Sequence, residues 1–172
     1  MPSRLKILIS YEDIAEAIDR LAAEITRDYK GKRPLLVGIL KGSFMFMADL
    51  VRHIHTPLEI DFVKLSSYGS GTESSGKIKA LTRLSARVKG RHVIVIEDIV
   101  DTGLTTGFLM EYLRKKKPAS LRLCALTEKP ARHQAPVSID YLGFTVPDKF
   151  IVGYGIDWNE KYRYLPDICY IE

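Results

Sequence analysis

The hydrophobic positions of this chain follow two patterns, one with the spacing of helices and one with the run lengths of strands. Residues 11–30 repeat apolar positions every three or four residues, as an amphipathic helix does, and Ser10 with Asp13 forms a capping signal before them. Residues 43–54 have the same helical spacing. The short apolar run 35-LLVGIL-40 between these segments predicts a buried strand.

The rest of the chain continues this alternation, and it predicts an α/β fold with a mostly parallel twisted sheet flanked by helices. No repeat or linker divides the sequence, so we expect one domain over residues 1–172. The remaining predicted elements are a helix at 105–117 and strands at 58–67, 77–84, 92–96, 121–126, 138–145, 150–156 and 168–171.

Composition is that of a globular protein, with 46% hydrophobic and 27% charged residues. No apolar run approaches the ~18 residues of a membrane span, and the N-terminus lacks the features of a signal peptide, so a cytoplasmic location without membrane contact is expected. Cys124 and Cys169 are far apart and have no C-x-x-C neighbour, which predicts two buried free thiols.

The formal net charge of +5 permits a nucleic-acid partner or a cleft for a small polyanion. The densest basic run, Arg114–Lys117, stands directly before Pro118. Cations at that point complement the dipole of an ending helix, so the run favours a solvated helix end over a nucleic-acid site.

One phosphate-binding signal is misleading. Gly71 to Lys77 match the G-x-x-x-x-G-K pattern of a P-loop, but Ile78 stands where the motif needs a hydroxyl for magnesium. The sequence after Lys77 also alternates like a strand, whereas a P-loop continues into a helix. A nucleoside triphosphatase is therefore not supported.

The stretch 93-VIVIEDIVDTGLTT-106 carries the candidate chemistry, because an apolar strand leads into Glu97, Asp98 and Asp101 and then into a turn before a helix. Free N–H groups at a helix N-terminus, with nearby hydroxyls, suit a phosphate. The acids would repel a phosphate, but they suit sugar hydroxyls or magnesium. The pattern predicts a sugar-phosphate ligand, and the plainer alternative is a capped helix beside exposed acids.

These residues carry a resemblance. 97-EDIVDTGLTT-106 resembles the phosphoribosyl-pyrophosphate loop of type I phosphoribosyltransferases, in particular their hypoxanthine-guanine branch. Four further segments resemble that branch in the same order, over nearly the whole chain: 40-LKGS-43, the Ser/Gly-rich loop 66-SSYGSGTESSG-76, 127-TEKP-130 and 147-PDKFIVGYGIDWNEKYRYL-165. The chain departs from the pattern at Leu104, where some relatives carry Lys, and at Trp158, a place often held by Tyr.

The resemblance implies an enzyme that moves the phosphoribosyl group from phosphoribosyl pyrophosphate to a 6-oxopurine. It also implies a small hood, a flexible lid near 66–76, magnesium as cofactor, and a homodimer or homotetramer. Glu97 and Asp98 would hold the ribose hydroxyls and magnesium, and Asp157 would hold a second magnesium. The other implied contacts to phosphoribosyl pyrophosphate are Asp101, Thr102, Gly103, Leu104, Thr105 and Thr106 at the sugar phosphate, and Lys41, Gly42, Arg163, Ser67 and Tyr68 at the pyrophosphate.

On the base side the resemblance implies that Lys129 donates to the 6-oxo group and that Phe150 stacks on the purine ring. Read alone, these residues would suit a solvated lysine and a core phenylalanine. Asp101 would accept the proton from N7 as the catalytic base. Ile99, the carbonyl of Ile151, and Asp157 would complete the purine site.

Two other classes stay open at this stage. One is a nucleic-acid-binding regulator of the same fold that senses phosphoribosyl pyrophosphate, although nucleic acid is the less favoured partner. The other is a transferase for xanthine and guanine, or for a pyrimidine.

Overall fold

The computed structural model describes residues 5–68, 77–80 and 82–172. Its elements alternate between strands and helices through the first two thirds of the chain and end in short strands. In chain order they are β1 (Leu5–Ile9), α1 (Tyr11–Asp28), β2 (Leu35–Leu40), α2 (Phe44–His53), β3 (Glu59–Tyr68), β4 (Lys77–Ala80), β5 (His92–Val100), α3 (Leu104–Lys115), β6 (Ser120–Glu128), a 3-10 turn (Pro130–Arg132), β7 (Tyr141–Thr145), β8 (Ile151–Val152) and β9 (Ile168–Ile171).

The larger sheet has the strand order β4-β3-β2-β5-β6-β7. Its strands are parallel from β3 to β7, and β4 pairs antiparallel to β3 as the return strand of a hairpin. This confirms the predicted α/β fold with a mostly parallel sheet. Because the strands are parallel, their carboxyl ends meet at one edge, where ligands collect in open sheets.

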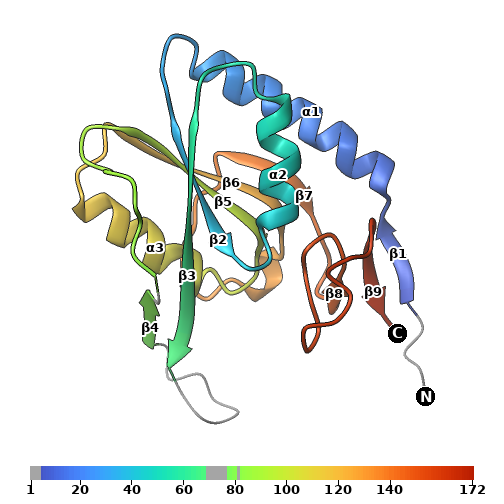
Figure 1. The fold of residues 1–172 in the computed structure, drawn as a ribbon. Helices are drawn as coiled ribbons and strands as arrows, with labels where there is room; N and C mark the ends of the chain where they lie inside the picture. The colour runs from blue at the N-terminus through green and yellow to red at the C-terminus, as the bar shows by residue number, and fades with distance from the viewer. Residues whose placement is uncertain (1–4, 69–76, 81) are drawn as a thin grey trace.

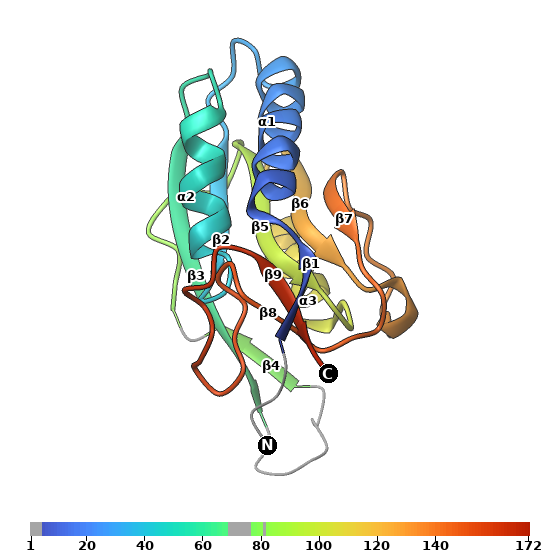
Figure 2. The same cartoon turned by 90° about the vertical axis from the view of Figure 1, so that its right-hand side faces the viewer.

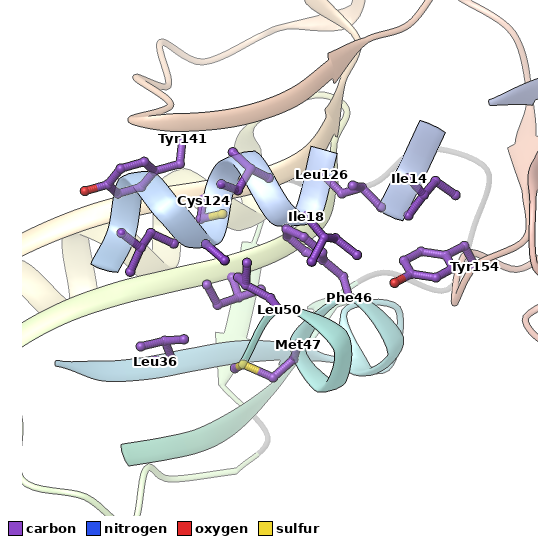
Figure 3. Close-up of a cluster of buried hydrophobic side chains, with 14 of the residues drawn as sticks. Ile14, Ile18, Leu36, Phe46, Met47, Leu50, Cys124, Leu126, Tyr141 and Tyr154 are labelled. Atoms are coloured by element: carbon purple, nitrogen blue, oxygen red, sulfur yellow. The ribbon is translucent and has the colours of Figure 1, made fainter. Parts of the chain in front are cut away.

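Alternate residues of the central strands point to opposite faces of the sheet. On one face, Leu36 and Ile94 pack beneath α1 and α2. On the other face, Val37 and Val95 pack with Leu109 of α3. Figure 1 shows α1 and α2 together on one side of the sheet and α3 on the other. Figure 3 shows the first cluster, in which side chains from both helices and from the strands interdigitate.

A second, smaller sheet forms the hood, with the order β1-β9-β8 and antiparallel pairing throughout. It joins the start of the described chain to its end, since Leu5 pairs with Ile171. Figure 2 shows this sheet at one end of α1, beside the carboxyl ends of the central strands. The last two strands, β8 and β9, therefore lie outside the parallel core, whereas β7 belongs to it and pairs parallel with β6.

Two predicted boundaries are wrong in ways that bear on function. The strand predicted at 150–156 is only Ile151–Val152, because Gly153, Tyr154 and Gly155 have positive φ and turn the chain back. The strand predicted at 92–96 continues to Val100, so Glu97 and Asp98 lie on β5 itself and are buried.

Two other predictions hold. The capping box of Ser10 and Asp13 is present at α1. Cys124 and Cys169 are free and buried. Among the residues that the structure describes, no helix is long and apolar enough to cross a membrane.

Candidate active site

Two carboxyl groups are buried at the end of β5. Glu97 is 6% exposed and Asp98 is 7% exposed, which rejects the alternative of exposed acids. Burial, together with the neighbouring Asp98 charge, raises the pKa of Glu97 well above its usual value. Burial also raises the pKa of Asp98, although hydrogen bonds from Glu97 and from backbone amides oppose this rise. Burial therefore disfavours a second negative charge on this pair, and a bound cation would offset that cost.

The turn after β5 presents backbone N–H groups to the same place. Gly103 has a φ of 79° and caps α3, and a Cβ there would come within 2.8 Å of Val137. The first N–H groups of a helix have no intrahelical acceptor, so those of Thr105 and Thr106 face outward from its N-terminus. The Thr106 hydroxyl donates to Glu97 Oε2 at 3.2 Å. These residues, with Asp98, Asp101 and Thr102, line a hollow of about 180 Å³.

The β2–α2 loop closes over Asp98. The Leu40–Lys41 peptide bond is cis. A Cβ on Gly42 would lie 2.1 Å from Asp98 Oδ2, and one on Gly155 would lie 2.2 Å from the Gly42 carbonyl oxygen. Only glycine at both positions lets the loop pass between the buried acid and the hood.

Arg163 belongs to a hood network that reaches this loop through Glu160 and Lys41. Its guanidinium donates to the Gly155 carbonyl at 2.7 Å and pairs with Asp157 Oδ1 at 2.8 Å. Glu160 lies 3.3 Å from the same guanidinium and also pairs with Lys41 Nζ at 2.8 Å. The Nε of Arg163 is buried and has no hydrogen-bond partner in the described structure. The sequence did not single out Glu160, because the motif that contains it was recognised by its aromatic and aspartate residues.

A second hollow of about 520 Å³ adjoins the first and shares Ile99 and Asp101 with it. Lys129, which lines it, is 6% exposed, so it is not the solvated lysine of the simpler reading. Phe150 also lines it and is 53% exposed, so it is not a core residue. Both observations favour a ligand site over the structural alternatives. Ile151 and Asp157 complete the wall.

Arg132 is a residue that the sequence did not indicate. It lines the second hollow, and its Nε lies 2.8 Å from Asp101 Oδ1. Its Nη1 lies 3.7 Å from Asp148. Asp101 and Arg132 come from different loops, so no spacing in the sequence announces the pair.

Comparison with known proteins agrees with this arrangement. The phosphoribosyl transferase domain family matches residues 9–159. A hypoxanthine-guanine phosphoribosyltransferase of Bacillus subtilis is 47% identical over 163 residues, which is 95% of this chain and 91% of that protein. This chain belongs to the hypoxanthine-guanine phosphoribosyltransferase family.

Solved structures of the family superpose closely on the chain. A hypoxanthine phosphoribosyltransferase from Staphylococcus aureus has a TM-score of 0.93 at 43% identity, and the match covers 97% of this chain and 91% of that one. A hypoxanthine-guanine phosphoribosyltransferase from Bacillus anthracis has a TM-score of 0.92 at 46% identity, covering 97% and 98%. The fold is therefore the type I phosphoribosyltransferase fold.

Part of the predicted phosphoribosyltransferase site lies outside the described residues. Ser67 and Tyr68 end β3, but their side chains are not described, and neither are residues 69–76 of the predicted lid. The strand β4 begins at Lys77, which agrees with the rejection of a P-loop.

The donor set fits a magnesium ion completed by a substrate. Among residues 5–68, 77–80 and 82–172, no group of three or more His, Cys, Asp or Glu side chains could hold a metal by itself. Magnesium commonly binds through one or two carboxylates plus substrate oxygens, and Glu97 with Asp98 offers that. Asp157 is less available, because Arg163 and the Glu160 amide take one of its oxygens each.

Proposed function

We propose that the chain transfers the phosphoribosyl group of phosphoribosyl pyrophosphate to N9 of hypoxanthine or guanine, giving the nucleotide and pyrophosphate in purine salvage. The observation that carries this is the pair of adjoining hollows that share Asp101. One has the acids and helix N-terminus that a sugar phosphate needs, and the other has a buried cation and an exposed aromatic ring. Residues 1–172 would act as one domain.

At the sugar end, the N–H groups and hydroxyls of the turn from Thr102 to Thr106 bind the 5′-phosphate. The contact at Leu104 is made by its backbone, so its side chain is free to vary. Glu97 and Asp98 bind the ribose hydroxyls and hold magnesium when it is present. A magnesium ion held there would supply positive charge against the pyrophosphate.

At the leaving group, the backbone N–H groups of Lys41 and Gly42 bind pyrophosphate. The guanidinium of Arg163 reaches the same group, helped by the unpartnered Nε. Asp157 would hold a second magnesium only after its bonds to Arg163 and the Glu160 amide rearrange. Ser67 and Tyr68 exclude water from the closed site, which prevents hydrolysis of the activated sugar.

At the base, Phe150 stacks on the purine ring and Ile99 lies beneath it. Lys129 donates to the 6-oxo group, which rejects adenine, because an amino group there would leave a buried cation unpaired. The Ile151 carbonyl faces the purine 2-position. The sugar carbon becomes cationic as pyrophosphate leaves, N9 forms the new bond, and Asp101 accepts the proton from N7.

Three features are proposed at the level of the whole protein: a homodimer or homotetramer, magnesium as the cofactor, and a cytoplasmic location. Light scattering coupled to size exclusion, and activity after removal of magnesium by a chelator, test the first two. A nucleic-acid regulator is not favoured, because regulation alone requires neither the buried Lys129 nor the exposed Phe150.

The decisive experiment is an assay with a panel of bases, carried out on the wild type and on Lys129→Met. Hypoxanthine and guanine should be substrates, and adenine and pyrimidines should not. Loss of a charged hydrogen bond of about 1.5–3 kcal/mol should raise the KM for hypoxanthine by roughly 10- to 100-fold, with little change in the KM for phosphoribosyl pyrophosphate. Equal rises in both KM values would assign Lys129 a structural role.

A further inference from the structure

A third hollow, of about 550 Å³, lies on the α3 face of the large sheet. The segment from β4 to β5 crosses this face beside α3, where Figure 1 shows it in yellow-green. Buried Val88 packs it into the core, and Gly90 N donates to the Lys117 carbonyl at 2.9 Å. The volume lies within the ordinary range of small-molecule sites, about 300–1,000 Å³. We call this hollow the basic groove.

The basic groove is separate from the active site. It shares no lining residue with the two hollows described above. Tyr112, which forms part of its wall, stands eight residues after Leu104 on α3. At ~1.5 Å per residue this is about 12 Å along the helix from the phosphate cradle.

The groove is lined by basic groups and by no acid. Its charged lining residues are Arg83, Arg87, Lys89 and Lys116. In the described part of the chain none of them forms an ion pair with a carboxylate, although neighbouring Lys115 pairs with Glu111 at 3.0 Å. Asp61, the acid that packs against this segment, accepts the backbone N–H groups of Ala86 and Phe62, each at 2.8 Å. The four cations around this hollow therefore have no carboxylate paired directly with them in the described part of the chain.

The aromatic wall of the groove is already covered. Phe108, one turn earlier on α3, stacks on Tyr112 with ring centroids 6.5 Å apart and an interplanar angle of 11°. Lys116, one turn later, holds its ammonium 4.7 Å from the centre of the same ring. Single-stranded nucleic acids bind through free aromatic faces on which bases stack, and Tyr112 offers no such face. The groove suits phosphate groups better than bases.

We propose that the basic groove binds a small polyphosphate anion, a chain of two or three phosphates either free or carried by a nucleotide. A compact anion fits a hollow in which all the cations converge, whereas a nucleic acid would need a track that continues beyond it. This site does not depend on the transferase reaction. Its binding is electrostatic and should weaken as salt rises.

Inorganic tripolyphosphate is the probe. Tripolyphosphate also resembles pyrophosphate, so it could bind at the active site as well. Amide chemical shifts distinguish the two sites, because Gly90 and Val88 report on the groove and Gly103 reports on the active site. Titration at low salt should shift the groove amides saturably. A free pyrimidine-rich oligoribonucleotide serves as the second probe, and a nucleoside triphosphate distinguishes free from nucleotide-borne phosphate.

The test variant is Arg87→Gln/Lys116→Gln, and the matched control is Arg114→Gln/Lys115→Gln, which removes the same charge from exposed residues that do not line the groove. The test variant should weaken tripolyphosphate binding at Gly90 roughly 5- to 20-fold, as expected for two exposed charge contacts, while the control changes it less than about twofold. Transferase activity without tripolyphosphate should be the same in all three proteins. Equal weakening in both variants, no shift at Gly90, or tighter binding of the oligoribonucleotide would overturn the proposal.

Discussion

Asp101 lies where the two active-site hollows meet, and its position distinguishes it from the other acids of the turn. In the proposed function Glu97 and Asp98 would face the sugar, where contacts would exist before and during the reaction. Asp101 also lines the hollow proposed for the base, where a proton is accepted only as the new bond forms. Arg132 lies 2.8 Å from its carboxylate, on the side of the same hollow.

Asp101→Asn should therefore lower kcat by about 10²–10⁴, the usual span of general acid–base catalysis, and should leave the KM for phosphoribosyl pyrophosphate nearly unchanged. Steady-state kinetics with both substrates varied measure the split. Arg132→Gln is the companion variant, and it should lower kcat less than Asp101→Asn does, because the carboxylate itself remains. Nearly full kcat in Asp101→Asn would reduce Asp101 to a residue that shapes the turn.

Glu97 gives a prediction about stability. Burial raises its folded-state pKa above that of the unfolded chain, about 4.3. Above about pH 4 the Glu97 carboxyl therefore stays protonated more often in the folded protein than in the unfolded chain. By linkage, the free energy of unfolding that depends on this carboxyl falls as the pH rises. Glu97→Gln removes the charge that burial disfavours. Without ligand, the Tm of this variant at pH 8 should exceed that of the wild type by about 2–4 °C. A gain of ~1 kcal/mol in the free energy of unfolding gives such a shift in a domain of this size.

The difference between Glu97→Gln and wild type should shrink at pH 4, where the wild-type carboxyl is already protonated. Glu111→Gln, at an exposed position on α3, is the control and should change Tm little at either pH. A variant that is less stable than wild type at pH 8 would contradict the burial argument. Magnesium should stabilise the wild type more than Glu97→Gln.

At the scale of elements, α1 is fastened to β6 and β7 by one polar cluster. Tyr141 donates to Asp28 Oδ2 at 2.7 Å, and Arg122 donates to the same oxygen at 2.8 Å. The Tyr141 hydrogen bond, with further help from Arg27 and Arg122, lowers the pKa of Asp28 to about 2. Because the folded pKa lies below the unfolded value, this stabilisation is present above about pH 4 and is lost as pH falls through 2.

Tyr141→Phe removes the hydroxyl and keeps the ring that packs in the core. The free energy of unfolding at pH 7 should fall by about 1 kcal/mol. This is less than a buried hydrogen bond to a charged group usually contributes, because the cluster is partly exposed to solvent. Urea denaturation at pH 7 and pH 3 measures it, and the loss should be smaller at pH 3. Tyr164→Phe, at a residue that is 76% exposed, is the control. An equal loss at both pH values would show that Asp28 is not the partner that matters.

The sequence predicted elements better than it predicted contacts. Helix α1 was predicted because its period and its Ser10 cap are local signals. The end of β8 was wrong because Tyr154, a residue that ordinarily favours strands, adopts a positive φ between two glycines. The burial of Lys129 and the pairing of Asp101 with Arg132 depend on which loops meet in space. Contacts between distant loops produce no regular spacing in the sequence. The resemblance to a family indicated the role of Lys129 but not the pair of Asp101 and Arg132.

At the scale of the whole molecule, the site is assembled between the parallel core and the hood. The hood contacts the core where Gly155 passes the Gly42 carbonyl, and Tyr154 donates a hydrogen bond to Asp49 of α2. The base hollow therefore has one wall on each body, with Lys129 from the core and Phe150 from the hood. A purine would bridge the two.

Trp158, the only tryptophan of the chain, reports on that bridge. Its ring lies 6.2 Å from Phe150, edge to face at 70°, and stacks on Tyr162 at 6.4 Å. A purine that stacks on Phe150 changes the surroundings of the indole, which is 40% exposed. Titration with inosine or guanosine monophosphate should change Trp158 fluorescence saturably, with a midpoint equal to the calorimetric Kd.

Phe150→Leu keeps an apolar side chain but removes the stacking face. Since stacking on an aromatic ring contributes about 1–3 kcal/mol per base, the nucleotide Kd should rise roughly 5- to 100-fold, and the fluorescence midpoint should move with it. Ribose 5-phosphate alone is the control, because its proposed site is the turn from Thr102 to Thr106 and it should change the emission less than a nucleotide does. If Phe150→Leu binds nucleotide as tightly as wild type while Trp158 still responds, the base stacks elsewhere in the hood, and the exposed face of Phe150 then belongs to a contact between protein copies.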